Sequence, residues 1–295
     1  MMRAATNAAV IAAVVLVTVK AAAYAATNSV AMMSSVADSA LDVLASGLNY
    51  FAVRHALTPA DEGHTFGHGK AEPLSALAQA AFIAGSAVLV LAESITRIGN
   101  PVAVERGDIG IAVMVFATLV TICLVAFQRY VVRKTQSQAI AADSLHYAGD
   151  VMMNLSVIAA IFCATTLNIR WADPVFGVGI AMYLFFNVFK IARGAVANLM
   201  DQELPDADRL RVIETARRHP KVKDVHELRT RTSGLNTFVQ MHLVLDRSLT
   251  LLEAHRIADD VEKAIMAEFP GADVIIHQDP DGVVELHKPV GSPLH

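Results

Sequence analysis

The sequence is poor in cysteine and in charge, and both shortages exclude classes of protein. Its two cysteines, Cys123 and Cys163, lie in separate apolar runs without the spacing of a thiolate metal site, so we interpret both as packing residues. The net charge of −4 provides no basic surplus for nucleic-acid binding. No Gly-rich phosphate-binding loop occurs, which argues against ATP as an energy source, and no His-Glu-x-x-His motif marks a metallopeptidase.

Apolar residues take the place of the missing charges. They make up 54% of the 295 residues, and the mean hydropathy is +0.45, too high for an ordinary soluble protein of this size. Six segments are long enough to cross the ~30 Å hydrocarbon core of a membrane. They span residues 8–26, 29–53, 74–98, 109–131, 139–167 and 172–199. The sequence therefore predicts a helical membrane protein with six transmembrane helices.

The first apolar segment has a second interpretation as a secretory signal. Arg3, an Ala/Val core and a final Ala-Tyr-Ala resemble the three regions of such a signal. Lys20 inside the core, and the second segment directly after it, favour a retained helix instead.

The distribution of basic residues predicts the orientation of the six spans. The connections between the second and third spans and between the fourth and fifth carry Arg54, Lys70, Arg129, Arg133 and Lys134. On the other side, acidic residues offset the basic ones, namely Glu105, Asp108 and Asp173 against Arg97, Arg106 and Arg170. Because Lys and Arg accumulate on the cytoplasmic side, we expect both termini in the cytoplasm.

The pattern after about residue 200 is that of a soluble domain. Helices are predicted over 205–219 and 251–269, the second stopped by Pro270-Gly271. Alternating strands are predicted over 225–232 and 237–245, with a turn at Ser233-Gly234, and a last strand over 273–277. The αββαβ order predicts a small α+β domain. We thus expect a transmembrane domain over 1–204, a cytoplasmic domain over 205–282 and a disordered tail over 283–295.

Four ionisable residues lie inside two of the apolar segments. Asp38 and Asp42 belong to the second, and His146 and Asp150 to the fifth. Each pair is spaced i, i+4, which puts both side chains on one helix face. Ionisable groups at membrane depth are costly and commonly mark an ion path, although intramembrane polar groups can also serve only to join helices.

The depths of the two pairs can be compared because the two helices run in opposite directions. With Arg54 and Lys134 as markers of the cytoplasmic interface, Asp42 and His146 lie ~18 Å deep, and Asp38 and Asp150 lie ~24 Å deep. Two pairs at equal depth can form one four-coordinate site. Asp143, about one turn before His146, fits an interfacial capping role better than ligation.

The ligand types favour Zn²⁺ or a similar first-row ion, because imidazole and carboxylate suit it and four ligands suit tetrahedral geometry. Metal binding requires deprotonated ligands, so it is coupled to proton release. A site of this kind can exchange a metal ion for protons as it faces each side of the membrane in turn.

Further histidines and carboxylates gather outside the apolar segments. The loop 59–70 carries Asp61 with His64 and His68 four residues apart, a plausible three-ligand site, although these are also residues that a solvated loop can carry. His226 and His242 lie on predicted strands, and His277 and Asp279 share an i, i+2 spacing on one strand face. Each could be an ordinary surface residue, but their concentration favours metal ligands.

These motifs together resemble the cation diffusion facilitator family, most closely its bacterial ferrous-iron/zinc efflux branch. The resemblance rests on Asp38-x-x-x-Asp42, His146-Tyr-Ala-Gly-Asp150, the loop sequence Pro-Ala-Asp-Glu-Gly-His-Thr-Phe-Gly-His-Gly-Lys ending at Lys70, and the C-terminal Ile-Ile-His-Gln-Asp-Pro ending at Pro280. It implies a homodimeric metal/proton antiporter, not an enzyme, in the bacterial inner membrane. The resemblance also implies six spans per subunit and a ferredoxin-like cytoplasmic domain.

The resemblance also implies three metal sites. The transport site falls on Asp38, Asp42, His146 and Asp150, and the loop site on Asp61, His64 and His68. The cytoplasmic binuclear site falls on His226, His242, His255, His277 and Asp279. His55, His219, His287 and His295 match no ligand position.

The resemblance makes Zn²⁺ both the transported ion and a structural or regulatory one, with Fe²⁺ and Cd²⁺ as alternative substrates. The expected partners are divalent metal ions, protons, membrane lipid and a second copy of the chain, and no nucleic acid. A different hypothesis is a non-transporting membrane metal sensor or scaffold that uses only the cytoplasmic sites. Loss of metal flux on replacing Asp150 would distinguish a transporter from a sensor.

Overall fold

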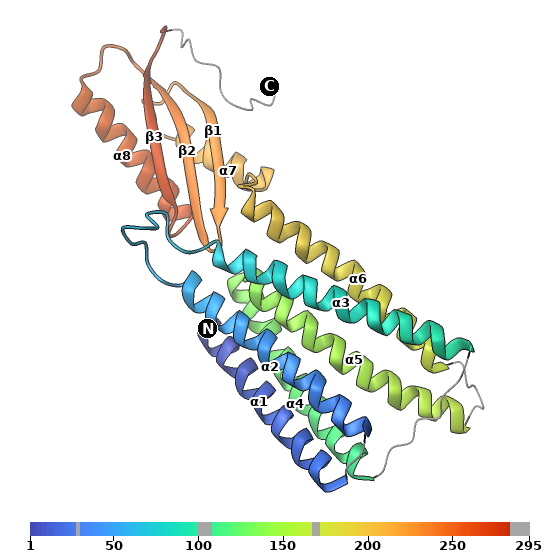
Figure 1. Ribbon diagram of the computed structural model, residues 1–295. Coiled ribbons are helices and arrows are strands. Elements are labelled where there is room, and N and C mark those ends of the chain that lie inside the picture. The colour runs from blue at the N-terminus through green and yellow to red at the C-terminus, as the bar shows by residue number, and fades with distance from the viewer. Residues whose placement is uncertain (28–29, 100–107, 167–171, 284–295) are drawn as a thin grey trace. The chain divides into compact units, whose positions relative to one another are not determined.

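A computed structural model describes residues 1–27, 30–99, 108–166 and 172–283, and the chain forms two compact units, Met1–Ala197 and Asn198–His295. Six long helices that run alongside one another make up the first unit (Figure 1). They are α1 (Met2–Thr27), α2 (Val30–Ala56), α3 (Ala71–Gly99), α4 (Asp108–Thr135), α5 (Gln138–Thr166) and α6 (Ala172–Leu199). Each contains one of the six predicted spans, apart from one or two terminal residues of the second and fifth spans that are not described.

Length and composition suit four of the described helices, α1, α3, α4 and α6, to crossing a membrane. The other two, α2 and α5, are just as long, at 27 and 29 residues. These two helices carry the ionisable residues Asp42, His146 and Asp150. In hydrocarbon every backbone polar group must be satisfied within the protein, which a helix does by itself. A helix does not satisfy its polar side chains in this way, so the ionisable side chains of α2 and α5 need a separate explanation.

The helices of the first unit pack through small residues. Ala5, Ala9 and Ala13 of α1 are fully buried, and α1 lies against α2 and α4. Small side chains let helix backbones approach closely. Lipid is as apolar as the helices, so the hydrophobic effect does not drive membrane helices together, and close packing contributes to their association instead. Larger residues fill the contact between α3, α5 and α6, where Ile83, Leu145 and Leu184 share one cluster.

The second unit has the αββαβ order that the sequence predicts. Its elements are α7 (Asp206–Arg217), β1 (Asp224–Ser233), β2 (Asn236–Leu245), α8 (Leu251–Glu268) and β3 (Asp273–Pro280). The sheet order is β1-β2-β3, with β1 and β2 antiparallel and β2 and β3 parallel. Thr250 begins α8 with a capping box, in which its side chain and that of Glu253 each accept a hydrogen bond from the other residue's backbone N–H.

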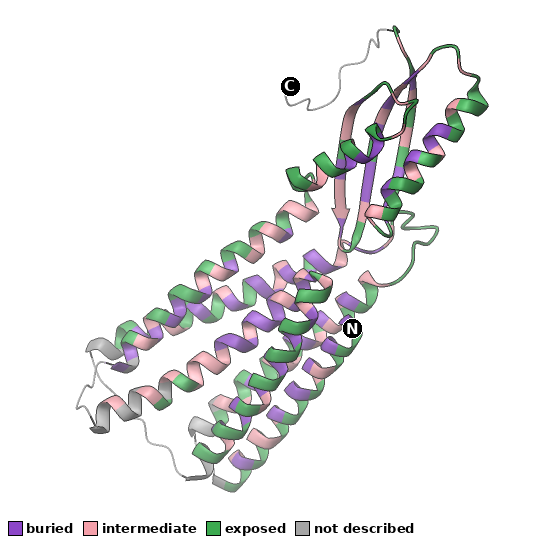
Figure 2. Ribbon diagram, turned by 180° about the vertical axis from the view of Figure 1, so that it is seen from behind, coloured by how far each residue is buried: buried purple, intermediate pink, exposed green. Residues whose placement is uncertain are grey.

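The core of this unit lies between the two helices and one face of the sheet. Along β2, Val239, Met241 and Leu243 are buried and pack with residues of α7 and α8, including Val212 and Ile257. The alternation of burial along the strands is visible in Figure 2. Because successive strand residues point to opposite faces, the residues between these buried ones lie on the face without helices.

Of the residues used to predict the membrane orientation, Glu105, Arg106 and Arg170 lie outside the described residues, as do residues 284–295 of the predicted tail.

Candidate metal centres

Helices α2 and α5 bring a carboxylate and an imidazole into direct contact within the first unit. His146 Nε2 lies 3.0 Å from Asp42 Oδ1, and both side chains are only 13% exposed. Asp150 completes a group of three whose ligand atoms all lie within 4.8 Å of one another. Ligand atoms around a tetrahedral zinc ion lie ~3.4 Å apart, so small side-chain adjustments would let these three bind one ion.

Asp38 is not part of this group. It lies one turn along α2 from Asp42, is exposed, and the described residues place it with no other ligand set. Its buried neighbour Ser39 accepts a hydrogen bond of 2.6 Å from Lys20 Nζ, which ties α1 to this turn of α2. Asp38 as the fourth ligand remains a prediction.

A buried hydrogen bond next to the candidate transport site holds α2 against α5. The hydroxyl groups of Ser46 and Tyr147 lie 2.7 Å apart, and both residues are fully buried. Ser46 is one turn from Asp42 and Tyr147 directly follows His146. This bond therefore fixes the relative position of the two helices that supply the ligands.

The interpretation of Asp143 as an interfacial cap is wrong. Helix α5 begins at Gln138, so Asp143 lies in its second turn, beyond the capping positions. It is completely buried and accepts hydrogen bonds from Gln79 Nε2 at 3.3 Å and from Gln128 Nε2 at 2.6 Å. These donors come from α3 and α4. The position of Asp143 along its own helix does not indicate contacts with other helices.

The cap of α5 is the residue directly before it. The Ser137 hydroxyl accepts a hydrogen bond from the backbone N–H of Ile140 at 3.2 Å, and so satisfies one of the donors that the first turn of a helix leaves without partners. Glu72 of α3 is buried close to this first turn.

The loop between α2 and α3 gathers its three predicted ligands. Asp61 Oδ1 accepts the backbone N–H of His64 at 2.7 Å and of Gly63 at 2.9 Å. Its two carboxylate oxygens lie 3.5 Å from His64 Nδ1 and 3.3 Å from His68 Nε2. The pKa of the Asp61 carboxyl lies below its usual value, and the backbone hydrogen bond from His64 is the main cause. The carboxylate is therefore kept in the ionised form that binds metal.

One histidine beside this loop was missed by the sequence reasoning. The ring of His55 lies 4.4 Å from the ring of His68, centroid to centroid. His55 belongs to the last turn of α2 and matches no family ligand position. His55 lies on another element and is separated from the loop ligands in sequence, so its proximity to His68 is visible only in the folded chain.

Three histidines form a row across the sheet of the second unit. His226, His242 and His277 occupy paired positions on β1, β2 and β3, on the face without helices. Their adjacent ring centroids are 5.1 and 4.7 Å apart. Asp279 is buried below them, with Oδ2 at 2.9 Å from His242 Nδ1 and 3.1 Å from His226 Nε2, and with Oδ1 at 3.1 Å from His277 Nε2. One carboxylate thus contacts three imidazoles, a donor set that suits a first-row metal ion.

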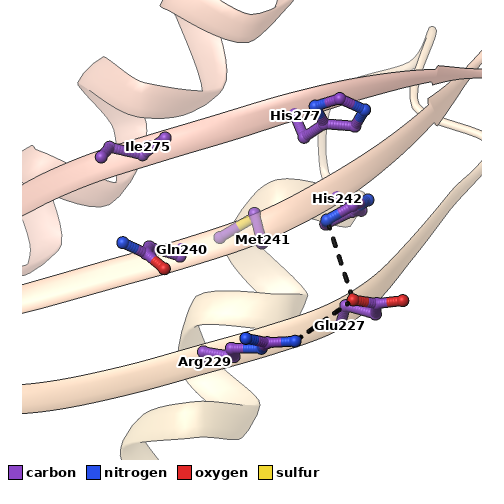
Figure 3. Close-up of a pocket in the computed structure, with 7 residues that line it drawn as sticks. All are labelled: Glu227, Arg229, Gln240, Met241, His242, Ile275 and His277. Carbon is purple, nitrogen blue, oxygen red and sulfur yellow. Dashed lines mark ion pairs between the residues drawn. The ribbon is translucent and has the colours of Figure 1, made fainter. Parts of the chain in front are cut away.

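Beside this row lies an open pocket of about 270 Å³. Figure 3 shows Glu227, His242 and His277 on three neighbouring strands around it. Glu227 Oε2 lies 3.9 Å from His242 Nε2 and 3.7 Å from Arg229 Nη2. Sequence reasoning missed Glu227 because the neighbour of His226 in a regular strand would point to the other face. A β-bulge between His226 and Arg229, with Glu227 at φ 48°, turns the side chain toward the site.

His255 does not reach this row within one chain. It lies on α8, on the far side of the sheet, where its Nδ1 is 3.7 Å from Asp259 and its side chain is 63% exposed. Its role as a ligand remains a prediction.

The fold and the sites define a membrane protein with a bundle of long helices, an intramembrane group of metal-ligand type, and an α+β domain with its own such group. A family model for the cation efflux transmembrane domain matches residues 7–200, and one for the cation efflux protein cytoplasmic domain matches residues 204–281. The chain belongs to the cation efflux family.

Similar proteins carry the same description. The cation-efflux pumps FieF of Salmonella paratyphi A and of Salmonella agona are each 46% identical over 274 residues, which cover 91% of this chain and 89% of theirs. A solved structure of CzrB in its Zn form is 32% identical over 29% of this chain and 98% of its own, with a TM-score of 0.27. A cadmium form of the MamM C-terminal domain is 26% identical over 25% of this chain and 95% of its own, with a TM-score of 0.25. The assignment rests on the family models and the FieF proteins.

Proposed function

We propose that this protein exports Zn²⁺ from the cytoplasm in exchange for protons, by alternating access of one intramembrane site. The observation that carries the proposal is the group of Asp42, His146 and Asp150, which lies between two membrane helices in a family of cation efflux proteins. Asp38 is the proposed fourth ligand. Fe²⁺ and Cd²⁺ are alternative substrates, because the same ligand types bind them and selectivity depends on geometry and availability.

The proposed coupling to protons follows from the chemistry of the ligands. Carboxylate and imidazole bind a metal ion only when deprotonated, so loading the site releases protons and reprotonation favours release of the metal. The metal-loaded site opens to the far side, where protons displace the metal ion, and the protonated site opens to the cytoplasm, where a new metal ion displaces the protons; this alternation gives antiport. The proton gradient then supplies the driving force.

The proposed setting is the bacterial inner membrane, with both termini in the cytoplasm and two copies of the chain per transporter. We assign residues 1–204 to the transmembrane domain, 205–282 to the cytoplasmic domain and 283–295 to a tail. In the cytoplasmic domain His226, His242, His277 and Asp279 would hold a regulatory ion, with His255 as a further proposed ligand. Asp61, His64 and His68 would hold another ion in the loop.

The decisive experiment measures Zn²⁺ flux into proteoliposomes under an imposed pH gradient. Asp150→Ala removes a proposed ligand and should reduce flux to the level of empty liposomes. Asp208→Ala is the matched control, because Asp208 is a carboxylate of α7 that forms an ion pair with Arg211 and is not among the proposed ligands. Undiminished flux in Asp150→Ala would refute the proposed transport site, and no Zn²⁺ flux above that of empty liposomes in the unmodified protein would favour the sensor or scaffold hypothesis. Zn²⁺ flux without accompanying proton movement would refute antiport.

A further inference from the structure

We infer that His55 is a fourth ligand of the loop site, so that a metal ion there is held by three imidazoles and one carboxylate. The inference rests on the proposed function, in which Asp61, His64 and His68 bind a metal ion. It adds a ligand from a different element, the end of α2, to a site otherwise built from the loop alone.

The geometry of the rings supports this assignment. The His68 ring lies between two others, 4.4 Å from that of His55 and 4.6 Å from that of His64, measured between centroids. The backbone at His55 is held in place, since its carbonyl accepts hydrogen bonds from the Thr58 N–H at 3.0 Å and the Thr58 hydroxyl at 2.5 Å. Three imidazoles therefore converge from both ends of the loop.

His68 itself indicates that a partner is missing. Its side chain is only 6% exposed, and Nε2 is directed at Asp61. Its other ring nitrogen, Nδ1, is buried and has no hydrogen-bond partner among the described residues. A buried polar atom without a partner is costly, so such an atom commonly marks a place where a ligand or a rearranged side chain belongs.

A small movement would complete the site. His55 is not within the 4.8 Å group of Asp61, His64 and His68, so its side chain must turn for a nitrogen to face the ion. The residue is exposed. Three protein ligands leave one position of a tetrahedral zinc ion to water, whereas four close it as in structural zinc sites.

The fourth ligand would connect the loop ion to the transport helix. His55 and Asp42 belong to the same helix, ~20 Å apart along its axis. An ion that binds the end of α2 and the loop before α3 together would restrict movement of α2, on which Asp42 lies. Imidazole-rich ligation favours ions of the zinc type over Mg²⁺ or Ca²⁺, so this restraint would respond to the same class of ion that the protein exports.

The test uses Co²⁺ as an optical probe of the full-length protein in detergent, in a reference variant with Asp150→Ala and Asp279→Ala so that the other two sites are disabled. The visible absorption of Co²⁺ reports its coordination number, and competition with a chelator reports affinity. His55→Phe keeps an aromatic ring beside His68 but removes both nitrogens, and His64→Ala removes one of the three ligands already proposed for the loop site. Unchanged elution and melting of the metal-free variants verifies folding.

We expect the reference variant to show the intense bands of four-coordinate Co²⁺. His55→Phe should change the spectrum to that of a site with added water and weaken binding by tenfold or more. An unchanged spectrum, with or without weaker binding, would overturn the proposal, since His55 would then be a packing or hydrogen-bonding neighbour. No Co²⁺ bound at the loop in the reference variant would also overturn it. Zn²⁺ flux of the otherwise unchanged chain is measured separately, so that neither result is confused with failure of the efflux proposal.

Discussion

At the scale of single residues, Asp143 shows how a buried carboxylate is accommodated among membrane helices. Its two oxygens accept hydrogen bonds from the side-chain amides of Gln79 and Gln128, on two other helices. Gln79 also donates to the carbonyl of Ala45 on α2 at 3.0 Å. One carboxylate thus joins four helices about one turn from His146, and replacing it should disturb their packing.

Asp143→Asn should lower the melting temperature of the purified protein. The new amide directs an N–H group at a glutamine N–H group, which loses a hydrogen bond and leaves a buried donor unsatisfied at ~1–3 kcal/mol. Thermal unfolding in detergent measures the loss. Adding Gln128→Glu restores a donor–acceptor pair with the original net charge, so the double variant should regain stability. If the two losses simply add, the direct contact is not the cause.

At the scale of elements, the ends of β1, β2 and β3 are joined by one ammonium group. Lys223 Nζ donates to Asp246 at 2.8 Å and also to Asp281. The hydrogen bond from Lys223 is the largest cause that lowers the pKa of each of these carboxyl groups below its usual value. Lys223 is exposed and the two carboxylates are partly exposed, so the cluster is screened by salt and modest in strength.

This cluster predicts a pH dependence with a defined sign. Because the folded pKa values of Asp246 and Asp281 are depressed, the unfolded chain binds more protons, and stability falls as pH drops below about 4. Lys223→Met should remove this contribution, so that the variant is less stable at pH 7 but loses less on acidification. Hydrogen exchange of the strand amides, measured with chelator present, tests both. Parallel losses in the two proteins would contradict the assignment.

The elements also show which features sequence periodicity can predict and which it cannot. The strand pattern predicts β2 almost to the residue, and the helix pattern predicts α8 because its capping residues are local. Glu227 is different, since a bulge in β1 depends on pairing with β2, which no single-strand pattern contains.

At the scale of the whole molecule, we expect metal binding at the cytoplasmic site to regulate transport in the proposed dimer. A metal ion held by His226, His242 and Asp279 would draw the cytoplasmic domains of two copies together. A spin label at Asp206→Cys, with Cys123 and Cys163 replaced by serine, should report a shorter distance between the copies when Zn²⁺ is added. Asp279→Ala should abolish the change. A distance that Zn²⁺ leaves unaltered in the unmodified site would contradict this mechanism.

The sequence by itself determined the six long helices, the αββαβ domain and the residue types of three candidate metal sites, because periodicity and i, i+4 spacing are local properties of the chain. The spacing also predicted the meeting of Asp42 and His146, since equal depth on opposed helices follows from the helical rise.

Tertiary structure alone decided which residues of each set lie together. It groups Asp42, His146 and Asp150 without Asp38, and it leaves His255 on the far side of the sheet from His242. It also adds His55 and Glu227, which no spacing rule indicates. The physical reason is that these positions depend on rotations of helices about their axes and on strand pairing, both of which are set by contacts between distant segments.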